Sequence, residues 1–522
     1  MVGAIRTGAR SGRARLLRLS PAALIVALYL VVALFTFVDY GISWDEPIQA
    51  LYAERVISYY ASGLEDRSYE QLLNLAYYGP VFEVLPAAVY AWLPEWKYEI
   101  RHLFIALFAA LGLMGVAQIA NRLSDDRRMP AFSVLILILM PAYYGHTFIN
   151  SKDVPFATLF TWSVWAVLKL FERPDRRNVL LLGTIAGLMF GIRVGGVLLF
   201  MIAAAALLAY ALKREARTRS LKLLPPLAVS GAVAWLIMIA VWPWAHRDPV
   251  GGPLEALRSA SSIPMVIEVL FGGRHWPASE LPSRFTAEMF AVTTPLPILA
   301  LVVLGFGLLV RRLIRRQAAF ADVLLIAWVL IPPILQIVVG ASRYDGTRHF
   351  LFVFPALAIL GAGGALAIAR VIDHPLATAG LVVAIASIIP AMVRLHPYQY
   401  TFRHEAVRDR YETDYWATSY KEAAEWIAEH RCADGTSVLM AGDRFLGPAL
   451  IYFLPEDVDV TVGLQQETAG EVPAQFDYYV GLRRQRLDEN YSDTPIAHSI
   501  GRLGMTFAVI RGGCANGELP RR

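Results

Sequence analysis

The sequence predicts a polytopic α-helical membrane protein of about eleven transmembrane helices, with a small α/β domain at its C-terminal end. Of the 522 residues, 56% are hydrophobic and only 17% are charged, against roughly 25% charged in an average soluble domain. The mean hydropathy is +0.47. Apolar residues gather in blocks of about 20, the length that a helix needs to cross hydrocarbon. Most of the chain is therefore expected to lie in a membrane.

The first apolar block, residues 21–38, follows a basic N-terminal segment, residues 1–19. A secretory signal also begins in this way, but the run is long and Val38-Asp39-Tyr40-Gly41 has no small-x-small cleavage site. We therefore expect a retained first helix that starts in the cytoplasm. Later spans are predicted at about residues 100–120, 131–148, 154–171, 178–192, 194–211, 223–244, 295–311, 319–340, 349–369 and 376–393.

The orientation follows from the short loops, because loops rich in Lys and Arg stay in the cytoplasm. With the N-terminus inside, the inner loops carry Arg122, Arg127 and Arg128; Arg173, Arg176 and Arg177; Lys213, Arg214, Arg217, Arg219 and Lys222; and Arg311, Arg312, Arg315 and Arg316. We expect a multi-pass protein of the inner or plasma membrane. The net charge of +5 belongs to loops facing anionic lipid, so membrane lipid is an expected partner and nucleic acid is not.

Residues 20–393 form the predicted membrane domain, with outer loops at 40–99 and 245–294, and an odd helix count leaves residues 394–522 outside the cytoplasm. A helical stretch at about 420–430 precedes short apolar runs at 437–440, 458–462, 478–481 and 506–510, which predicts a small α/β domain. Cys432 and Cys514 both lie there. An oxidising compartment permits a disulfide between them, and a pair of buried free thiols is the alternative.

Ionisable side chains gather at the outer helix ends and in the outer loops, while most spans have apolar centres. A charge at the bilayer centre costs at least ~2.5–3.5 kcal/mol, a cost that a transporter usually accepts in order to build a substrate site there. The distribution therefore favours chemistry at the outer surface over a conduction path.

Asp45 and Glu46 follow the first helix directly, in Ser43-Trp44-Asp45-Glu46-Pro47. Two adjacent carboxylates at the outer surface could present a general base to a bound acceptor. The alternative is a helix start, because an acidic residue before Pro also caps a helix.

A second outer loop holds His146, Asn150, Lys152 and Asp153 within eight residues. Such a group could bind a phosphate, a sugar hydroxyl or a metal, and Asp153 two residues before Pro155 is also a cap pattern. One His with one Asp lacks the usual metal-ligand spacing. A divalent metal therefore stays an open possibility, with Glu46 and His146 as its candidate ligands.

A third group consists of Arg348 and His349, at the outer start of a later helix, and Arg193, in a tight outer hairpin. A guanidinium matches phosphate geometry well, so these residues could hold an anionic headgroup. Arginines that only anchor the helices at the interface are the alternative.

Taken in order, these segments resemble the bacterial family 39 glycosyltransferases, GT-C-fold relatives of the protein O-mannosyltransferases and of the aminoarabinose lipid A transferase. The likeness covers residues 20 to about 430, and the order of its short motifs carries more weight than any one of them. The motifs are Asp45-Glu46, Asn150-Ser151-Lys152-Asp153-Val154-Pro155, Thr347-Arg348-His349-Phe350-Leu351-Phe352-Val353-Phe354-Pro355, His396-Pro397-Tyr398-Gln399-Tyr400, Tyr411-Glu412-Thr413-Asp414-Tyr415-Trp416 and Ser419-Tyr420-Lys421-Glu422.

The resemblance implies a GT-C-like membrane enzyme that moves a sugar from a polyprenyl-monophosphate donor to a lipid, glycan or protein acceptor outside the cytoplasm. Asp45 matches the base that deprotonates the acceptor, Glu46 would support it or help hold a divalent cation, and Asp153 matches the second acidic position. Arg348 matches the position where the family has a basic group near the lipid phosphate. His349, Lys152 and Arg193 are weaker matches to such a group.

One departure concerns the acceptor. The mannosyltransferases carry an extra folded domain in an outer loop, and residues 245–294 are too short to hold it, which argues against protein O-mannosylation. A single carboxylate base with direct displacement predicts inversion at the anomeric carbon. A transporter or flippase for lipid-linked envelope precursors, or a non-catalytic assembly protein, are the competing functions.

Overall fold

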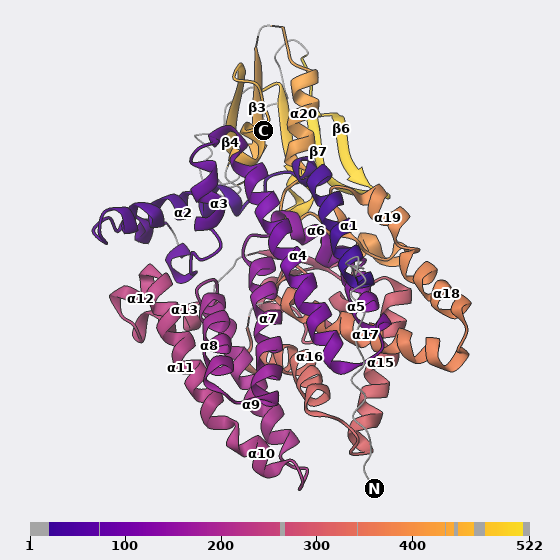
Figure 1. Cartoon of the computed structure of the whole chain (residues 1–522). Helices are drawn as coiled ribbons and strands as arrows, with labels where there is room; N and C mark the ends of the chain where they lie inside the picture. The colour runs from indigo at the N-terminus through magenta and orange to yellow at the C-terminus, as the bar shows by residue number, and fades with distance from the viewer. Residues whose placement is uncertain are drawn as a thin grey trace, which may run out of the picture.

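The computed structural model describes residues 20–72, 74–261, 267–341, 343–433, 435–442, 447–463 and 476–514. A long helical body carries a small sheet domain at one end, built from the last part of the chain (Figure 1). The body's longer helices are α1 (Pro21–Thr36), α4 (Lys97–Leu123), α5 (Arg128–Ile138), α6 (Pro141–Ile149), α7 (Asp153–Glu172), α8 (Arg176–Phe190), α9 (Leu198–Tyr210), α11 (Leu224–Val241), α15 (Leu296–Ile314), α16 (Phe320–Val339), α17 (Phe354–Ile372), α18 (Pro375–Ala386) and α19 (Ile389–Leu395).

Helices lie at all of the predicted spans, and they differ in length. Within the described residues, eight helices are long and apolar enough to cross a membrane. The predicted span at 131–148 consists of α5 and α6, bent by 69° at a short break, because Pro141 cannot continue the preceding helix. Counting this pair as one span gives nine. Helices α8 and α9 lie at two further predicted spans and are 15 and 13 residues long.

Small residues let the helices of the body pack closely. A Cβ at Gly305 of α15 would lie 1.9 Å from the carbonyl oxygen of Leu360 in α17, and one at Gly364 would lie 2.3 Å from that of Leu301. Only glycine permits this approach of two backbones, as is common between membrane helices.

Shorter elements cover the end of the body next to the sheet domain. Helix α2 follows the turn after α1, and α3 lies beside α4. The other elements of the body are α2 (Glu46–Ala61), α3 (Val84–Tyr90), α12 (Pro243–Arg247), α13 (Gly251–Ser261), the antiparallel hairpin β1 (Glu268–Phe271) and β2 (Arg274–Pro277), α14 (Phe285–Thr293), and α10 (Arg217–Lys222), which lies at the end opposite the sheet domain (Figure 1).

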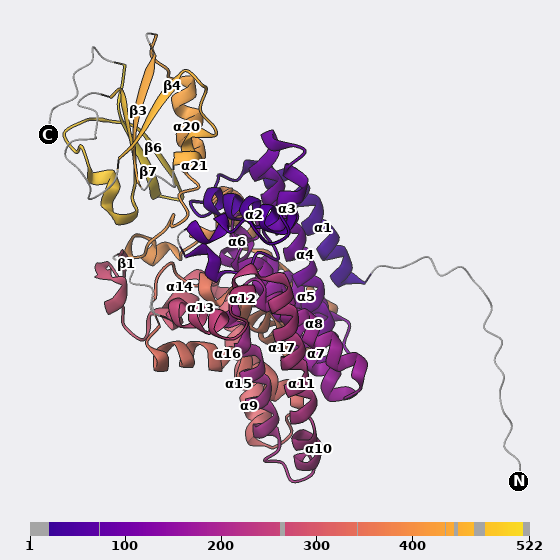
Figure 2. The same ribbon diagram turned by 90° about the vertical axis from the view of Figure 1, so that its left-hand side faces the viewer.

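The sheet domain contains five strands in the order β4-β3-β5-β7-β6, with α20 and α21 beside the sheet (Figure 2). Strand β3 is parallel to β4 and β5, and β7 is antiparallel to β5 and β6. Four strands lie at the four predicted apolar runs, whereas β6 was not predicted, because most of its residues are partly or fully exposed. The elements are α20 (Tyr420–Glu429), β3 (Thr436–Ala441), α21 (Gly447–Ile451), β4 (Val458–Gly463), β5 (Tyr478–Leu482), β6 (Ile496–Arg502) and β7 (Met505–Gly512).

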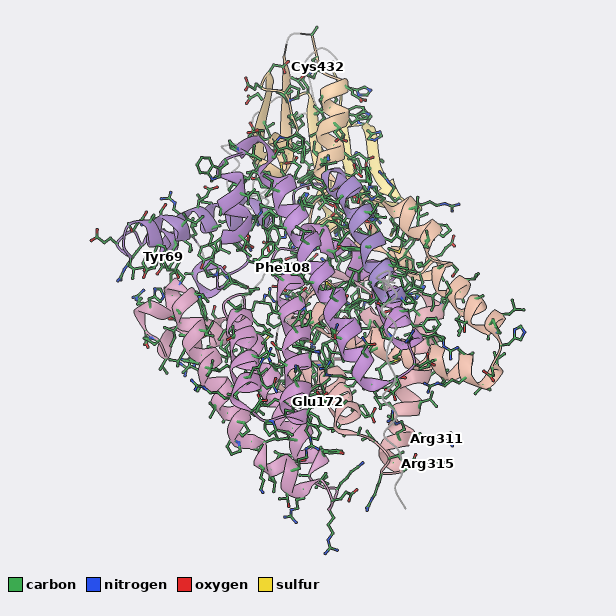
Figure 3. The ribbon with its side chains drawn as sticks, viewed as in Figure 1. Tyr69, Phe108, Glu172, Arg311, Arg315 and Cys432 are labelled. Carbon is green, nitrogen blue, oxygen red and sulfur yellow. A yellow bond between two sulfur atoms is a disulfide. The ribbon has the colours of Figure 1, made fainter. Side chains whose placement is uncertain are left out.

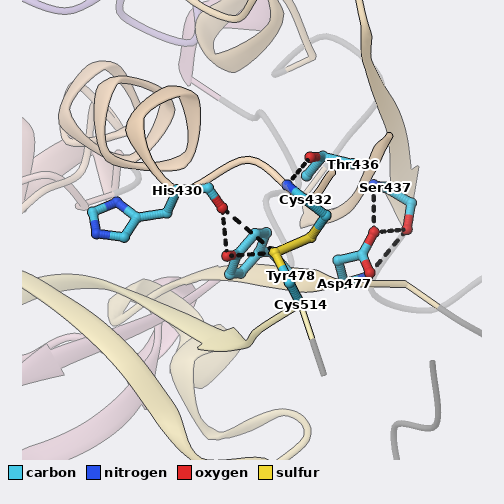
Figure 4. Close-up of a disulfide and its surroundings, with 7 residues drawn as sticks. All are labelled: His430, Cys432, Thr436, Ser437, Asp477, Tyr478 and Cys514. Atoms are coloured by element: carbon cyan, nitrogen blue, oxygen red, sulfur yellow. Dashed lines mark hydrogen bonds between the residues drawn. A yellow bond between two sulfur atoms is a disulfide. The ribbon is translucent and has the colours of Figure 1, made fainter. Parts of the chain in front are cut away.

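A disulfide joins Cys432 to Cys514 (Figure 4), so of the two alternatives that the sequence left open the structure contains the bridge. It ties the segment between α20 and β3 to the end of β7. Next to it, the Tyr478 hydroxyl donates to the carbonyl of His430 at 2.7 Å. The C-terminal end of α20 is thereby fixed to the start of β5, the central strand of the sheet.

Polar contacts dock the sheet domain on the body. Lys421 donates to the carbonyl of Val38 at 2.5 Å, and the Tyr452 hydroxyl donates to Glu99 at 3.0 Å. From the turn after β5, Arg484 donates to the carbonyl of Tyr415 at 3.1 Å. This last contact brings the sheet domain to the outer loops that carry the predicted site.

Candidate active site

Four outer segments meet below the sheet domain. They are the turn after α1, the turn between α6 and α7, the hairpin after α8, and the 3-10 turn η7 (Arg348–Val353) before α17. Five of the predicted site residues come together here. Asp45 pairs with Lys152, Asp153 pairs with Arg193, and the positive charge of Arg348 acts on both carboxylates.

Asp45 forms an ion pair across two of these segments. One carboxylate oxygen lies 3.0 Å from the Lys152 ammonium, and 24% of the Asp45 side chain is exposed. Asp45 stands at the N-cap of α2, yet its side chain makes no capping hydrogen bond. Burial raises the pKa of Asp45, but the positive charges of Lys152 and Arg348 outweigh burial and hold this pKa below its usual range. Asp45 is therefore an ionised carboxylate at neutral pH.

Asp153 forms a second, more deeply buried pair. Its carboxylate lies 2.9 Å from Arg193 and accepts a hydrogen bond of 3.0 Å from the Asn150 side chain. Asn150 in turn accepts from the backbone N–H of Asp153 at 2.8 Å. The carboxylate points toward Arg193 and makes no capping bond at the start of α7, so the cap interpretation does not describe it.

Tyr78 lies between the two cations of these pairs. Its ring centroid is 4.7 Å from the Lys152 ammonium and 5.4 Å from the Arg193 guanidinium. A cation over an aromatic face is stabilised by about 0.5–2 kcal/mol. The sequence shows Tyr78 only as one of several outer aromatics, and nothing in its neighbours marks it as the residue that both cations share.

The Tyr78 segment is joined to the Arg193 hairpin by backbone hydrogen bonds. The N–H of Gly79 donates to Ile192 at 3.1 Å, and the N–H of Val81 donates to Gly191 at 3.1 Å. A Cβ at Gly79 would lie 2.0 Å from the carbonyl oxygen of Gly191. The two loops can lie this close because position 79 is glycine.

Arg348 is enclosed by aromatic rings. Its guanidinium lies 5.1 Å from the ring of Tyr344, 4.7 Å from Tyr415 and 4.8 Å from Trp416, and 3.0 Å from the carboxylate of Asp345. Burial raises the pKa of Asp345 to about 8, although Arg348 opposes the shift. Arg348 is thus held rigidly and is only 7% exposed.

A cavity of about 530 Å³ lies beside these pairs. Arg193, Tyr78, Tyr344 and His349 line one part of it, and its remaining walls are mostly apolar. Met201 and Val339 are 51% and 57% exposed, so the cavity reaches the outer surface of the helical body. The apolar walls come from Phe156, Val194, Val197, Leu198, Met201, Leu257, Pro332, Leu335, Val339, Phe350 and Phe352.

Glu46 lies in a different cluster. It is fully buried, accepts from the backbone N–H of Ser43 at 2.8 Å, and lies 3.6 Å from Arg101 and 3.2 Å from His102. Arg101 is also paired with Glu83 at 2.8 Å. Glu46 therefore holds the turn after α1 on α4 and is not directed at the cavity.

The predicted metal ligands do not form a site. His146 is buried near Asn150 and the rings of Tyr400 and Trp416, away from the Glu46 cluster. No group of three or more His, Cys, Asp or Glu side chains that could hold a metal ion occurs in the part of the chain that the structure describes. The carboxylates beside the cavity are paired with cations, so this donor set does not fit a divalent metal.

Arg484 was not predicted from the sequence. It reaches from the sheet domain to lie 5.0 Å from the ring of Trp44 and 4.1 Å from that of Tyr415. It lies in the run Arg483-Arg484-Gln485-Arg486, which has the pattern of a solvated turn. Its burial arises only from docking of the domain, which no local pattern shows.

Comparison with known proteins supports the family resemblance. The profile of a family described as "Dolichyl-phosphate-mannose-protein mannosyltransferase" matches residues 96–244. Crystal structures of ArnT from Cupriavidus metallidurans, in the apo state and bound to undecaprenyl phosphate, match with a TM-score of 0.53 and 15% identity, over 93% of this chain and 97% of that chain. No curated protein sequence matches the chain. The structural likeness confirms the predicted fold class.

Proposed function

We propose that the protein is a membrane glycosyltransferase that moves a sugar from a polyprenyl-monophosphate donor to an acceptor on the side of the membrane where the sheet domain lies. The observation that carries this proposal is the cavity with apolar walls that ends at Arg193, next to the Asp153 and Asp45 ion pairs. An isoprenoid chain fits the apolar walls, and a phosphate fits the cationic end.

Two comparisons support the donor class. The matching family profile describes enzymes that use a dolichyl-phosphate sugar, and one of the ArnT structures with the same fold contains undecaprenyl phosphate. Both compounds are polyprenyl monophosphates. The shared fold and the cationic end of the cavity together favour this class of donor.

The donor phosphate binds by replacing the carboxylates that pair with Arg193 and Lys152. Arg193 and Lys152 are each paired with a carboxylate in the absence of donor. An entering phosphate competes for both cations, and His349 on the cavity wall is a further donor to a phosphate oxygen. Arg348, fixed by its aromatic rings, adds positive potential that stabilises the charge developing on the departing phosphate.

Asp45 acts as the general base. Withdrawal of Lys152 toward the phosphate removes the main charge that depresses the Asp45 pKa, so its carboxylate becomes more basic when donor is bound. It then takes the proton from the acceptor hydroxyl as this attacks the anomeric carbon and the sugar–phosphate bond breaks. A polyprenyl phosphate is a fair leaving group, so no catalytic acid is required, and a single displacement inverts the anomeric centre.

The test is sugar transfer by the purified full-length protein from a panel of polyprenyl-phosphate sugars, beside Asp45→Asn, with and without chelator. Transfer from one donor, lost in the variant, supports the proposal and identifies the sugar. Loss of activity with the chelator would identify a required divalent metal, and unchanged activity would exclude one.

Two outcomes would overturn the proposal. Full activity of Asp45→Asn would remove Asp45 as the base. Absence of turnover from every donor, with folded protein that binds polyprenyl phosphate, would instead support a lipid carrier or an assembly protein.

A further inference from the structure

A second cavity, of about 390 Å³, lies in the helical body at the end opposite the sheet domain. It is bounded by the C-terminal ends of α4, α15 and α17 and the starts of α5 and α16. Arg311 and Arg315, labelled in Figure 3, mark this end of the molecule, far from the disulfide. No residue of the candidate active site lines it.

The cavity has an apolar interior and a cationic rim. Its rim contains four exposed arginines, Arg311, Arg312, Arg315 and Arg370. Gly363 also lines it, and a Cβ there would meet no atom within 4 Å, so the space in front of this glycine is open. The apolar lining consists of Leu123, Met129, Leu308, Leu309, Leu325, Ile359, Leu360, Leu366 and Ala367.

The cationic charge of the rim is only partly neutralised. Asp322 pairs with Arg312 at 2.8 Å and also accepts the backbone N–H of Ala319 at 2.7 Å. Arg370 lies 3.5 Å from Asp126. Arg311 and Arg315 have no acidic partner within the described residues. Two guanidinium groups thus remain uncompensated directly above an apolar space.

We propose that this cavity binds one anionic phospholipid of the membrane leaflet at this end of the protein. The phosphate is held by Arg311 and Arg315, and an acyl chain enters the apolar space beside Gly363. Guanidinium groups pair with phosphate oxygens through two parallel N–H···O bonds, and basic pockets between membrane helices select anionic headgroups. A zwitterionic lipid would bring its own cation against the rim and bind less well. This inference does not depend on the proposed glycosyltransferase activity.

The experiment measures lipid bound to the full-length protein by native mass spectrometry, in detergent with phosphatidylglycerol, with phosphatidylcholine of the same acyl chains, or with undecaprenyl phosphate. We expect one phosphatidylglycerol to remain bound under conditions that remove phosphatidylcholine. Each arginine near a membrane surface contributes about 1 kcal/mol of lipid attraction, so Arg311→Ala with Arg315→Ala should weaken this binding roughly 25-fold.

Two further variants test the two parts of the cavity. Gly363→Leu keeps every arginine but fills the apolar space, and it should also lose the bound lipid. The control, Arg176→Ala with Arg177→Ala, removes the same charge from the start of α8, outside the cavity lining, and should keep it. Equal retention of phosphatidylcholine, a loss of bound undecaprenyl phosphate instead of phosphatidylglycerol in the arginine variant, or unchanged binding in both the arginine and Gly363 variants would overturn the proposal.

Discussion

Asp45 and Glu46 are neighbours in the sequence, yet they belong to two clusters that differ in accessibility. Asp45 pairs with Lys152 and is 24% exposed, beside a cavity. Glu46 is 1% exposed and shares Arg101 with Glu83, inside the packing between α2, α3 and α4. Both clusters contain carboxylates and cations at similar distances. The comparison teaches that two adjacent carboxylates with similar cationic partners can differ widely in exposure, which the type of residue does not show.

The largest expected effect is a loss of sugar-transfer activity when the Asp45 cluster, and not the Glu46 cluster, is changed. Replacing Asp45 with Asn should lower sugar transfer by about 10²–10⁴-fold, the usual contribution of a general base, and leave the melting temperature nearly unchanged. Turnover and thermal unfolding of the same preparation are the measurements. A fall in stability as large as that in activity would mean that Asp45 is a support like Glu46.

The second prediction concerns the buried cluster of Glu46, Arg101 and Glu83. Arg101→Met leaves Glu46 and Glu83 buried without their cation, and removal of one partner of a buried pair typically costs about 3–5 kcal/mol. The melting temperature and expression level should both fall. Lys97→Met is the matched control, since its pair with Glu54 is 26% and 43% exposed, and it should cost at most about 1 kcal/mol. An equal response of the two variants would contradict the distinction between buried and exposed pairs.

A smaller effect concerns donor binding. Arg193→Ala should raise the KM for the lipid-linked donor roughly 10–100-fold, because a hydrogen bond to a charged group contributes about 1.5–3 kcal/mol. Arg343→Ala is a control in a neighbouring loop, where the guanidinium donates to the carbonyl of Leu281. A loss of kcat with an unchanged KM would show that Arg193 does not bind the donor.

The smallest effect is a pH dependence of stability. Burial raises the pKa of Asp345 to about 8, from 3.8, so the folded protein holds this proton more tightly than the unfolded chain. The resulting stability is complete below pH 3.8 and is lost as the pH rises through 8, by at most about 1.4 kcal/mol per pH unit. Melting temperatures between pH 5 and 8.5 should fall less steeply in Asp345→Asn than in the parent. Identical slopes would rule out Asp345 as the titrating group.

Much of the fold could be predicted because hydrophobic length and strand runs are local signals. Four of the five strands followed from them, whereas the disulfide was one of two open alternatives. The bend between α5 and α6 was missed, since hydropathy does not show where Pro141 ends a helix. The predicted boundaries of the membrane and outer domains, and the orientation of the termini, stay predictions.

The site was predictable in part. Motif order pointed to Asp45, Asp153 and Arg348, and the structure brings these residues close together. Their pairing with Lys152 and Arg193, and the separation of Glu46 from Asp45, depend on which way each side chain turns after the loops meet. Tyr78 and Arg484 join the group only through tertiary packing. A single sequence contains no pattern that predicts such contacts between distant segments.

The close contact of Gly79 with Gly191 restricts which substitutions this protein tolerates. A Cβ at Gly79 would lie 2.0 Å from the carbonyl oxygen of Gly191 and would push apart the two loops that carry Tyr78 and Arg193. Met201 in α9 and Val339 in α16 line the same cavity from other elements. Substitutions there would reshape the apolar wall without moving these loops.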